Sequence, residues 1–203
     1  MSTVKCWWFG FWIRIAYWLN LRKIVCYFWR SWFKENQRRP LPTFTTPEEL
    51  QLYMMSRFQY RYDRLEASFM GHRFLFPIDW VSDPEVFQAR IEDPAIKDGD
   101  CDDIHMWAAA ILSRMPGIEK VYLLSSGFQG GGHATVVFFA AGRWRHLDYK
   151  LYELLNPNAA MDGVVQRYTK GDRPKEVTFW VFERVHNWPE IWKPEAICPA
   201  RLR

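Results

Sequence analysis

The stretch Gly99-Asp100-Cys101-Asp102-Asp103 runs directly into Ile104-His-Met-Trp-Ala-Ala-Ala-Ile-Leu-Ser-Arg-Met115. In the second part, apolar side chains recur three and four residues apart, which predicts a helix with one buried face. The helix is expected to begin near Asp100 or Cys101 and to end before Pro116-Gly117. Cys101 then lies in the first helical turn, where free N–H groups and the positive end of the helix dipole stabilise a thiolate.

Two further polar residues stand on strands that the sequence predicts after this helix. His133 begins the apolar run 133–139 directly after Gly131-Gly132, and Asp148 ends the run 143–148. Because only a short turn separates the two runs, they predict a hairpin in which His133 and Asp148 are cross-strand neighbours. A thiol, an imidazole and a carboxylate are the nucleophile, the proton carrier and the orienting group of thiol acyl transfer. We therefore expect Cys101, His133 and Asp148 to form a catalytic triad.

The acids around the cysteine oppose its activation. The thiol pKa would be raised by four neighbouring carboxylates unless these point away or cap the helix, namely Asp98, Asp100, Asp102 and Asp103. An imidazolium close to the sulfur offsets them, and this is the role expected of His133. The acids superficially resemble an EF-hand loop. That loop requires glycine at its sixth position and glutamate at its twelfth, where this sequence has Asp103 and Ala109.

These motifs resemble those of the transglutaminase-like cysteine enzymes, and most closely the transglutaminase-like cysteine peptidases of bacteria and phages. The similarity spans about residues 48 to 155 and lies in Gly99-Asp100-Cys101-Asp102-Asp103, Gly132-His133-Ala134 and Leu147-Asp148. It implies an α+β fold with a papain-like, transglutaminase-like core, in which a cysteine-bearing helix packs on an antiparallel sheet. It also implies acyl transfer on a peptide or protein substrate, by peptide hydrolysis, amide deamidation or cross-linking, with hydrolysis as the leading expectation.

The resemblance carries implications for cofactors and source as well. The expected chemistry requires no cofactor. In a bacterial branch of the family the acids that flank the cysteine bind calcium, and such a site would fall on Asp100 and Asp102 of this sequence. A phage or bacterial source is implied. The donor of the oxyanion hole stays open among Trp80, Gln59 and the backbone N–H of Cys101.

Each candidate residue also has a simpler interpretation. Cysteine is among the residues most often buried in protein interiors, His133 could be a structural histidine at a strand end, and Asp148 could be a turn residue. An apolar interior does not suit a cysteine framed by aspartates, which favours the catalytic interpretation. His105, one helical turn after Cys101, is expected to be a surface histidine because no other metal-ligand pattern accompanies it. The alternative function is a catalytically silent scaffold, or an interaction protein associated with virions or membranes.

Residues 1–36 differ in composition from the rest of the chain. They contain half of the 12 tryptophans and, before Glu35, no acidic residue. A helical projection gives a basic amphipathic segment, but Arg14 and Arg22 interrupt its apolar face, so no run is long enough to span a bilayer. No signal-peptide cleavage pattern follows. The segment is expected to bind a membrane surface or a partner protein, and amphipathic periodicity does not distinguish the two.

A proline-punctuated linker at residues 37–47 separates this segment from residues 48–203, the predicted catalytic domain. The chain has 203 residues and a net charge of +4, an excess too mild to predict a nucleic-acid partner. Its 4 cysteines form no CxxC pair, which indicates neither a zinc site nor a disulfide framework and favours a reducing compartment. A cytoplasmic or peripheral membrane location is therefore expected.

The remaining local signals place elements around the triad. Thr46 before Pro47 predicts a capped helix from Pro47 to about Arg57, and Pro84 starts a short helix to about Arg90. Further strands are predicted at 120–125 and 177–183, a glycine-rich loop at 126–132, and turns at 77–80 and 140–142.

Overall fold

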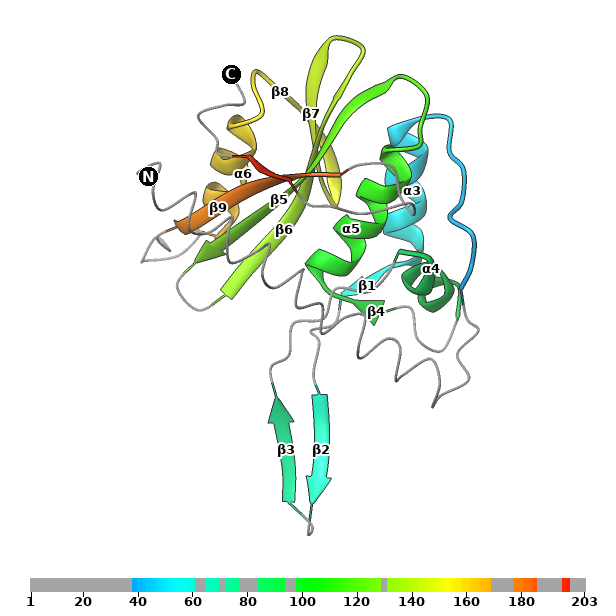
Figure 1. Ribbon diagram of the computed structural model, residues 1–203, viewed down its shortest axis with the longest axis vertical. Helices are drawn as coiled ribbons and strands as arrows, with labels where there is room; N and C mark the ends of the chain where they lie inside the picture. Colours follow the sequence, from blue (N-terminus) through cyan, green and yellow to red (C-terminus); the bar gives the residue numbers. More distant parts are fainter. Residues whose placement is uncertain are drawn as a thin grey trace.

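The computed structural model describes residues 38–60, 65–69, 72–76, 84–93, 98–128, 131–168, 177–185 and 195–197. Within these ranges the protein is a mixed α+β fold, as expected, with helices packed on an antiparallel sheet (Figure 1). The amphipathic segment 1–36 and the turn predicted at 77–80 lie outside the described residues. Within the described part of the chain, no helix combines the length and the apolar character that crossing a bilayer requires.

In the part of the chain that the structure describes, the main sheet has six strands, each antiparallel to its neighbours. Four of them form a meander, and the later part of the chain returns to add two strands beside the first of the four. In spatial order the strands are β10 (Glu195–Ile197), β9 (Val177–Arg184), β5 (Ile118–Phe128), β6 (Gly131–Ala140), β7 (Arg143–Asp148) and β8 (Lys150–Leu154). A separate hairpin of β2 (Leu65–Phe69) and β3 (His72–Phe76) projects away from this sheet (Figure 1).

The four predicted strands are all present, and three of them are longer than expected. The loop predicted at 126–132 is wrong, because β5 and β6 stay paired through Gly127 and Gly132 and on to Phe128 and Gly131. Continued pairing satisfies backbone N–H and C=O groups that a loop would leave to solvent, so the glycines extend the hairpin. The short turn after β6 is confirmed, and Gly142 adopts φ 74 there.

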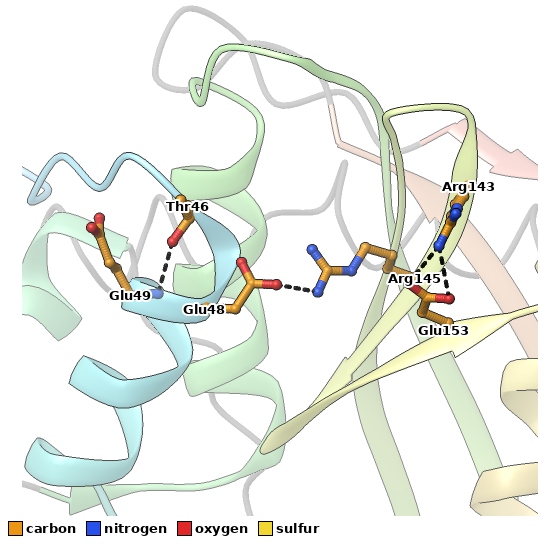
Figure 2. Close-up of polar contacts among 6 residues, drawn as sticks. All are labelled: Thr46, Glu48, Glu49, Arg143, Arg145 and Glu153. Atoms are coloured by element: carbon orange, nitrogen blue, oxygen red, sulfur yellow. Dashed lines mark hydrogen bonds and ion pairs between the residues drawn. The ribbon is translucent and has the colours of Figure 1, made fainter.

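Helix α3 (Pro47–Arg57) has the predicted boundaries. The Thr46 hydroxyl oxygen accepts a hydrogen bond from the Glu49 N–H at 3.2 Å, and the Glu49 carboxylate reaches back to the Thr45 N–H at 2.8 Å (Figure 2 shows the first contact). These two contacts satisfy backbone donors that precede the first helical hydrogen bond. The sequence therefore contained each local signal for the start of this helix, namely a capping residue, a proline and acids in the first turn.

One ion pair joins α3 to the sheet, and another joins two strands of the sheet. Figure 2 shows Arg145 of β7 reaching Glu48 on α3, and Arg143 donating to Glu153 of β8 at 3.1 Å. The hydrogen bond from Arg145 lowers the pKa of Glu48. The pair between Arg143 and Glu153 is exposed at both ends, so its contribution to stability is small.

Helix α5 (Cys101–Leu112) begins where predicted and is buried on all sides. Sheet strands β5 and β6 pack on one side of it, and α3 and α4 (Pro84–Glu92) pack on the other. The expectation of one buried face was wrong, because two further helices cover the opposite face. Trp107 lies at the centre of this core and donates from its ring nitrogen to the Gln88 side-chain oxygen at 2.8 Å.

A second, smaller core lies on the other face of the sheet. Alternating residues of β5 contribute to the two clusters, with Leu123 facing α5 and Leu124 facing helix α6 (Ala159–Tyr168). Ala160 and Met161 of α6 are buried there. This alternation gives the layers α5, sheet and α6, which the sequence did not predict because neither α6 nor β8 was recognised.

Gly99 precedes the cysteine by two residues and has no room for a side chain. It lies on β4 (Asp98–Gly99), which pairs in parallel with β1 (Gln59–Tyr60). A Cβ at position 99 would lie 2.6 Å from the Phe87 ring and 3.0 Å from an Asp103 carboxylate oxygen. The glycine of the motif thus lets β4 approach α4 and the start of α5.

We expect Gly99→Ala to destabilise the protein by about 2 kcal/mol, because the buried Phe87 ring and Asp103 must both shift. In a chain of this size the melting temperature should fall by about 4–8 °C. Gly163→Ala is the matched control, since an added Cβ there meets nothing within 4 Å and alanine is the better helix former. Equal melting temperatures for Gly99→Ala and the wild type would contradict the tight packing at Gly99.

Candidate active site

Cys101 is the first residue of α5 and is partly buried. Asp100 occupies the N-cap position in an extended conformation, but its side chain makes no capping hydrogen bond. The positive end of the helix dipole acts on the sulfur at this position. This effect favours the thiolate form of Cys101.

The structure partly resolves the conflict between the thiol and its neighbouring acids. Asp103, whose side chain is fully buried, pairs with Arg90 of α4 at 3.3 Å. The Asp102 carboxylate accepts the Asp103 N–H at 2.9 Å. Two of the negative charges near Cys101 are thus held by donors within the protein, which reduces their effect on the sulfur.

His133 and Asp148 are in contact, as expected. Nε2 of His133 lies 2.9 Å from Oδ1 of Asp148, and both side chains are almost completely buried. The pairing of Val136 with Leu147 places His133 and Asp148 diagonally across the β6–β7 ladder, within reach of each other on one face. Because a carboxylate only accepts, Nε2–H of His133 is the donor. In the neutral ring this leaves the lone pair on Nδ1, which is the nitrogen able to accept a proton.

His105 connects the helix start to this pair. Its Nδ1 lies 2.6 Å from the carbonyl oxygen of Cys101, and its ring centroid lies 6.0 Å from that of His133 in an edge-to-face arrangement. The prediction of a surface histidine was wrong, because His105 is completely buried. The sequence did hold a signal for burial, since His105 is the one polar residue in the run 104–112.

Tyr149 completes the cluster, and the sequence did not reveal it. Its ring centroid lies 5.0 Å from that of His105 and 6.3 Å from that of His133, and its other neighbour is Phe58, stacked at 6.0 Å. Tyr149 adopts φ 58, a left-handed conformation that is uncommon for a bulky residue. It directly follows Asp148, so this turn places an aromatic ring over the two histidines.

The structure describes two of the three candidates for the oxyanion donor. Gln59 is exposed on β1 and pairs with Asp98, three residues before the cysteine. The N–H of Cys101 belongs to the first turn of α5. Trp80 lies outside the described residues. Gln59 and the Cys101 N–H thus stay as candidates, the first through strand pairing next to the cysteine motif and the second as part of the nucleophile's own backbone.

The carboxylates of Asp100, Asp102 and Asp103 lie within 4.8 Å of one another, close enough to share a cation. Protein donors already engage two of them, and the Arg90 guanidinium lies among them. Of these three acids, Asp100 is the one with a buried carboxylate oxygen that has no hydrogen-bond partner among the described residues. Calcium binds six to eight oxygens, so this donor set does not fit it as arranged. The calcium site expected on Asp100 and Asp102 stays a prediction.

Burial makes His105 a source of acid sensitivity. Desolvation lowers its pKa from 6.5 to about 3, an effect that the charges of His133 and His146 reinforce and that of Asp148 opposes. The unfolded chain therefore binds one more proton than the folded chain between these two values. The stability that the protein gains from holding His105 neutral is fully present above about pH 6.5 and is lost progressively as the pH falls toward about 3.

We expect His105→Leu to remove this sensitivity. Between pH 7 and pH 5 the free energy of unfolding of the wild type should fall by about 2 kcal/mol more than that of the variant. Urea unfolding at the two pH values measures the difference. Parallel losses in the two proteins would show that His105 is not held neutral.

No family model, curated protein or solved structure matches this chain. What the site does chemically must therefore follow from the residues and contacts of the chain itself.

Proposed function

We propose that this protein is a cysteine-dependent acyl-transfer enzyme, acting on peptide or amide substrates as a hydrolase. Cys101 is the nucleophile, His133 carries the proton, and Asp148 orients the imidazole and stabilises its cation. The observation that carries the proposal is the buried contact between His133 Nε2 and Asp148 Oδ1 at 2.9 Å. This contact supports Nδ1 as the base nitrogen, and His105 links the same ring to the residue that bears the thiol.

The steps follow from these positions. Nδ1 of His133 accepts the proton of the Cys101 thiol, and the sulfur attacks the acyl carbon of the substrate. His133 then returns the proton to the leaving amine, and the carbon–nitrogen bond breaks to give a thioester on Cys101. Water, deprotonated by His133, attacks the thioester carbon, the carbon–sulfur bond breaks to release the acid, and His133 returns the proton to the Cys101 sulfur. An amine in place of water would give cross-linking by the same route.

We further propose that the core is transglutaminase-like, and thus papain-like. Support comes from the order of the parts: a cysteine at the start of α5, then a histidine on β6 and an aspartate on the adjacent β7. Helix α5 packs directly on β5 and β6, so the cysteine-bearing helix and the antiparallel sheet form one unit. The predicted attachment of residues 1–36 to a membrane surface or partner protein concerns residues outside this unit and stays a prediction, as does the cytoplasmic or peripheral membrane location.

An activated ester tests the proposal without knowledge of the natural substrate. With p-nitrophenyl acetate, the folded protein should release p-nitrophenol in a burst that matches the number of Cys101 thiols, and peptide mapping should find the acetyl group on Cys101. The same protein unfolded in denaturant is the reference. Acetylation of Cys101 no faster than in the unfolded chain would support the alternative, a catalytically silent scaffold.

A further inference from the structure

One buried group next to the triad has no part in the steps above. His105 is completely buried, and its Nδ1 lies 2.6 Å from the carbonyl oxygen of Cys101. A carbonyl oxygen only accepts, so Nδ1–H must be the donor, which fixes the tautomer of the neutral ring. Its Nε2 then carries the lone pair and has no hydrogen-bond partner among the described residues. This donor therefore acts on the backbone of the nucleophile itself.

The ring of His105 also contacts the proposed base. It meets the His133 ring at an interplanar angle of 80° and the Tyr149 ring at 69°, with centroids 6.0 Å and 5.0 Å away. Edge-to-face packing of this kind fixes ring positions more narrowly than apolar contact alone. One side chain thus touches both the first turn of α5 and the imidazole on β6.

We propose that His105 is a positioning residue, which sets the distance between the Cys101 thiol and the His133 imidazole through its hydrogen bond and its ring contact. The proposal rests on the acyl-transfer function proposed above. His105 itself takes no proton and forms no bond in these steps. The hydrogen bond holds the first turn of α5 to the His105 ring, and the ring contact joins that ring to β6. Without the hydrogen bond the first turn of α5 is held less tightly, and the ion pair between thiolate and imidazolium weakens.

The charges around His105 are compatible with this role. Its ring contacts His133 on β6 and Tyr149 after β7, and the charges that act on it are those of Asp148 and His146 on β7 and of His133. Burial lowers its pKa to about 3, so it stays neutral where a thiol enzyme works. A cationic His105 would repel the imidazolium of His133, and neutrality removes that cost.

A matched pair of variants separates positioning from packing. In His105→Asn the amide nitrogen can take the place of Nδ1–H and donate to the Cys101 carbonyl. His105→Leu has nearly the same shape and no donor. As a buried apolar side chain, leucine should give the more stable protein of the two. If the role of His105 is purely structural, Cys101 should react faster in the more stable variant, His105→Leu. If His105 is a positioning residue, Cys101 should react faster in the variant that keeps a donor, His105→Asn.

The readout is the rate of iodoacetamide alkylation of Cys101 in the folded proteins near pH 6.5. We expect His105→Leu to react about tenfold more slowly than His105→Asn, since one hydrogen bond is worth about that factor. Equal rates in the two variants, or a faster His105→Leu, would overturn the role of His105 and leave the proposed function intact. A wild-type rate no faster than that of unfolded protein would overturn both.

The tautomer can be read in the wild type, independently of any variant. ¹⁵N NMR of the imidazoles should show His105 as a neutral ring protonated on Nδ1, with shifts constant from about pH 5 to 8. A ring that titrates near pH 6.5, or one protonated on Nε2, would remove the hydrogen bond from which the positioning role follows.

Discussion

Replacing Cys101 by alanine is expected to abolish acyl transfer while leaving the fold intact. Because the thioester forms on the sulfur, removing the sulfur should lower the rate of acyl transfer by at least about four orders of magnitude, to the background set by binding alone. Cys101 is only partly buried at the edge of the main core, so the free energy of unfolding should change by about 1 kcal/mol or less. Ester turnover and thermal unfolding of the purified variant measure the two effects.

Cys101→Ser serves as the control for shape. The hydroxyl replaces the thiol at nearly the same volume, but its proton is far harder to remove, so the burst should disappear here too. Turnover retained in Cys101→Ala would rule out the thiol mechanism. Turnover lost together with the folded state would instead mean that Cys101 is a structural residue.

The second large effect is expected for Asp148→Asn. The carboxylate accepts Nε2–H of His133 at 2.9 Å in a site closed to solvent. An amide can present its NH₂ group to Nε2 instead, which moves the ring proton to Nδ1 and removes the base that takes the thiol proton. It also removes the negative charge that stabilises the imidazolium. We expect kcat to fall by about 10⁴-fold, as in a serine triad with the same change, with little effect on KM.

Glu153→Gln is the matched control, because it makes the same acid-to-amide change on the adjacent strand β8. Glu153 pairs with Arg143 at the surface, where an ion pair contributes little. Its kcat should equal that of the wild type. An Asp148→Asn protein within a few-fold of the wild type would show that the buried contact with His133 does not orient a base.

The sequence predicted the parts of the fold that have complete local signals. Thr46, Pro47 and the two following glutamates fix the start of α3, and α5 begins where the glycine-aspartate-cysteine motif ends. Helix α6 was missed although Asn156 accepts the Ala159 N–H at 3.1 Å as a cap, because Gly163 weakens its helical pattern. Burial of Ala160 and Met161 against the sheet holds it in place, and that is a tertiary effect.

Some contacts of the candidate site could also be predicted from local sequence signals, and others could not. Contact between His133 and Asp148 could be predicted because hairpin pairing follows from the apolar alternation of the two strands. Burial of His105 depends on α3 and α4 covering the outer face of α5, which the pattern of α5 alone does not encode. Tyr149 depends on a left-handed backbone that a bulky residue rarely adopts. The first contact is local to one hairpin, and the other two depend on how the layers assemble.

The pH dependence of alkylation at Cys101 tests the Cys–His pair most directly. Iodoacetamide labelling would be followed by mass spectrometry in the wild type and in His133→Ala, with Cys6, Cys26 and Cys198 of the same chain as reference thiols. An ion pair predicts a rate that reaches its plateau well below the ordinary thiol pKa of about 8.5 and loses that plateau in His133→Ala. Indistinguishable profiles at all four thiols, unchanged by the substitution, would contradict a thiolate activated by His133.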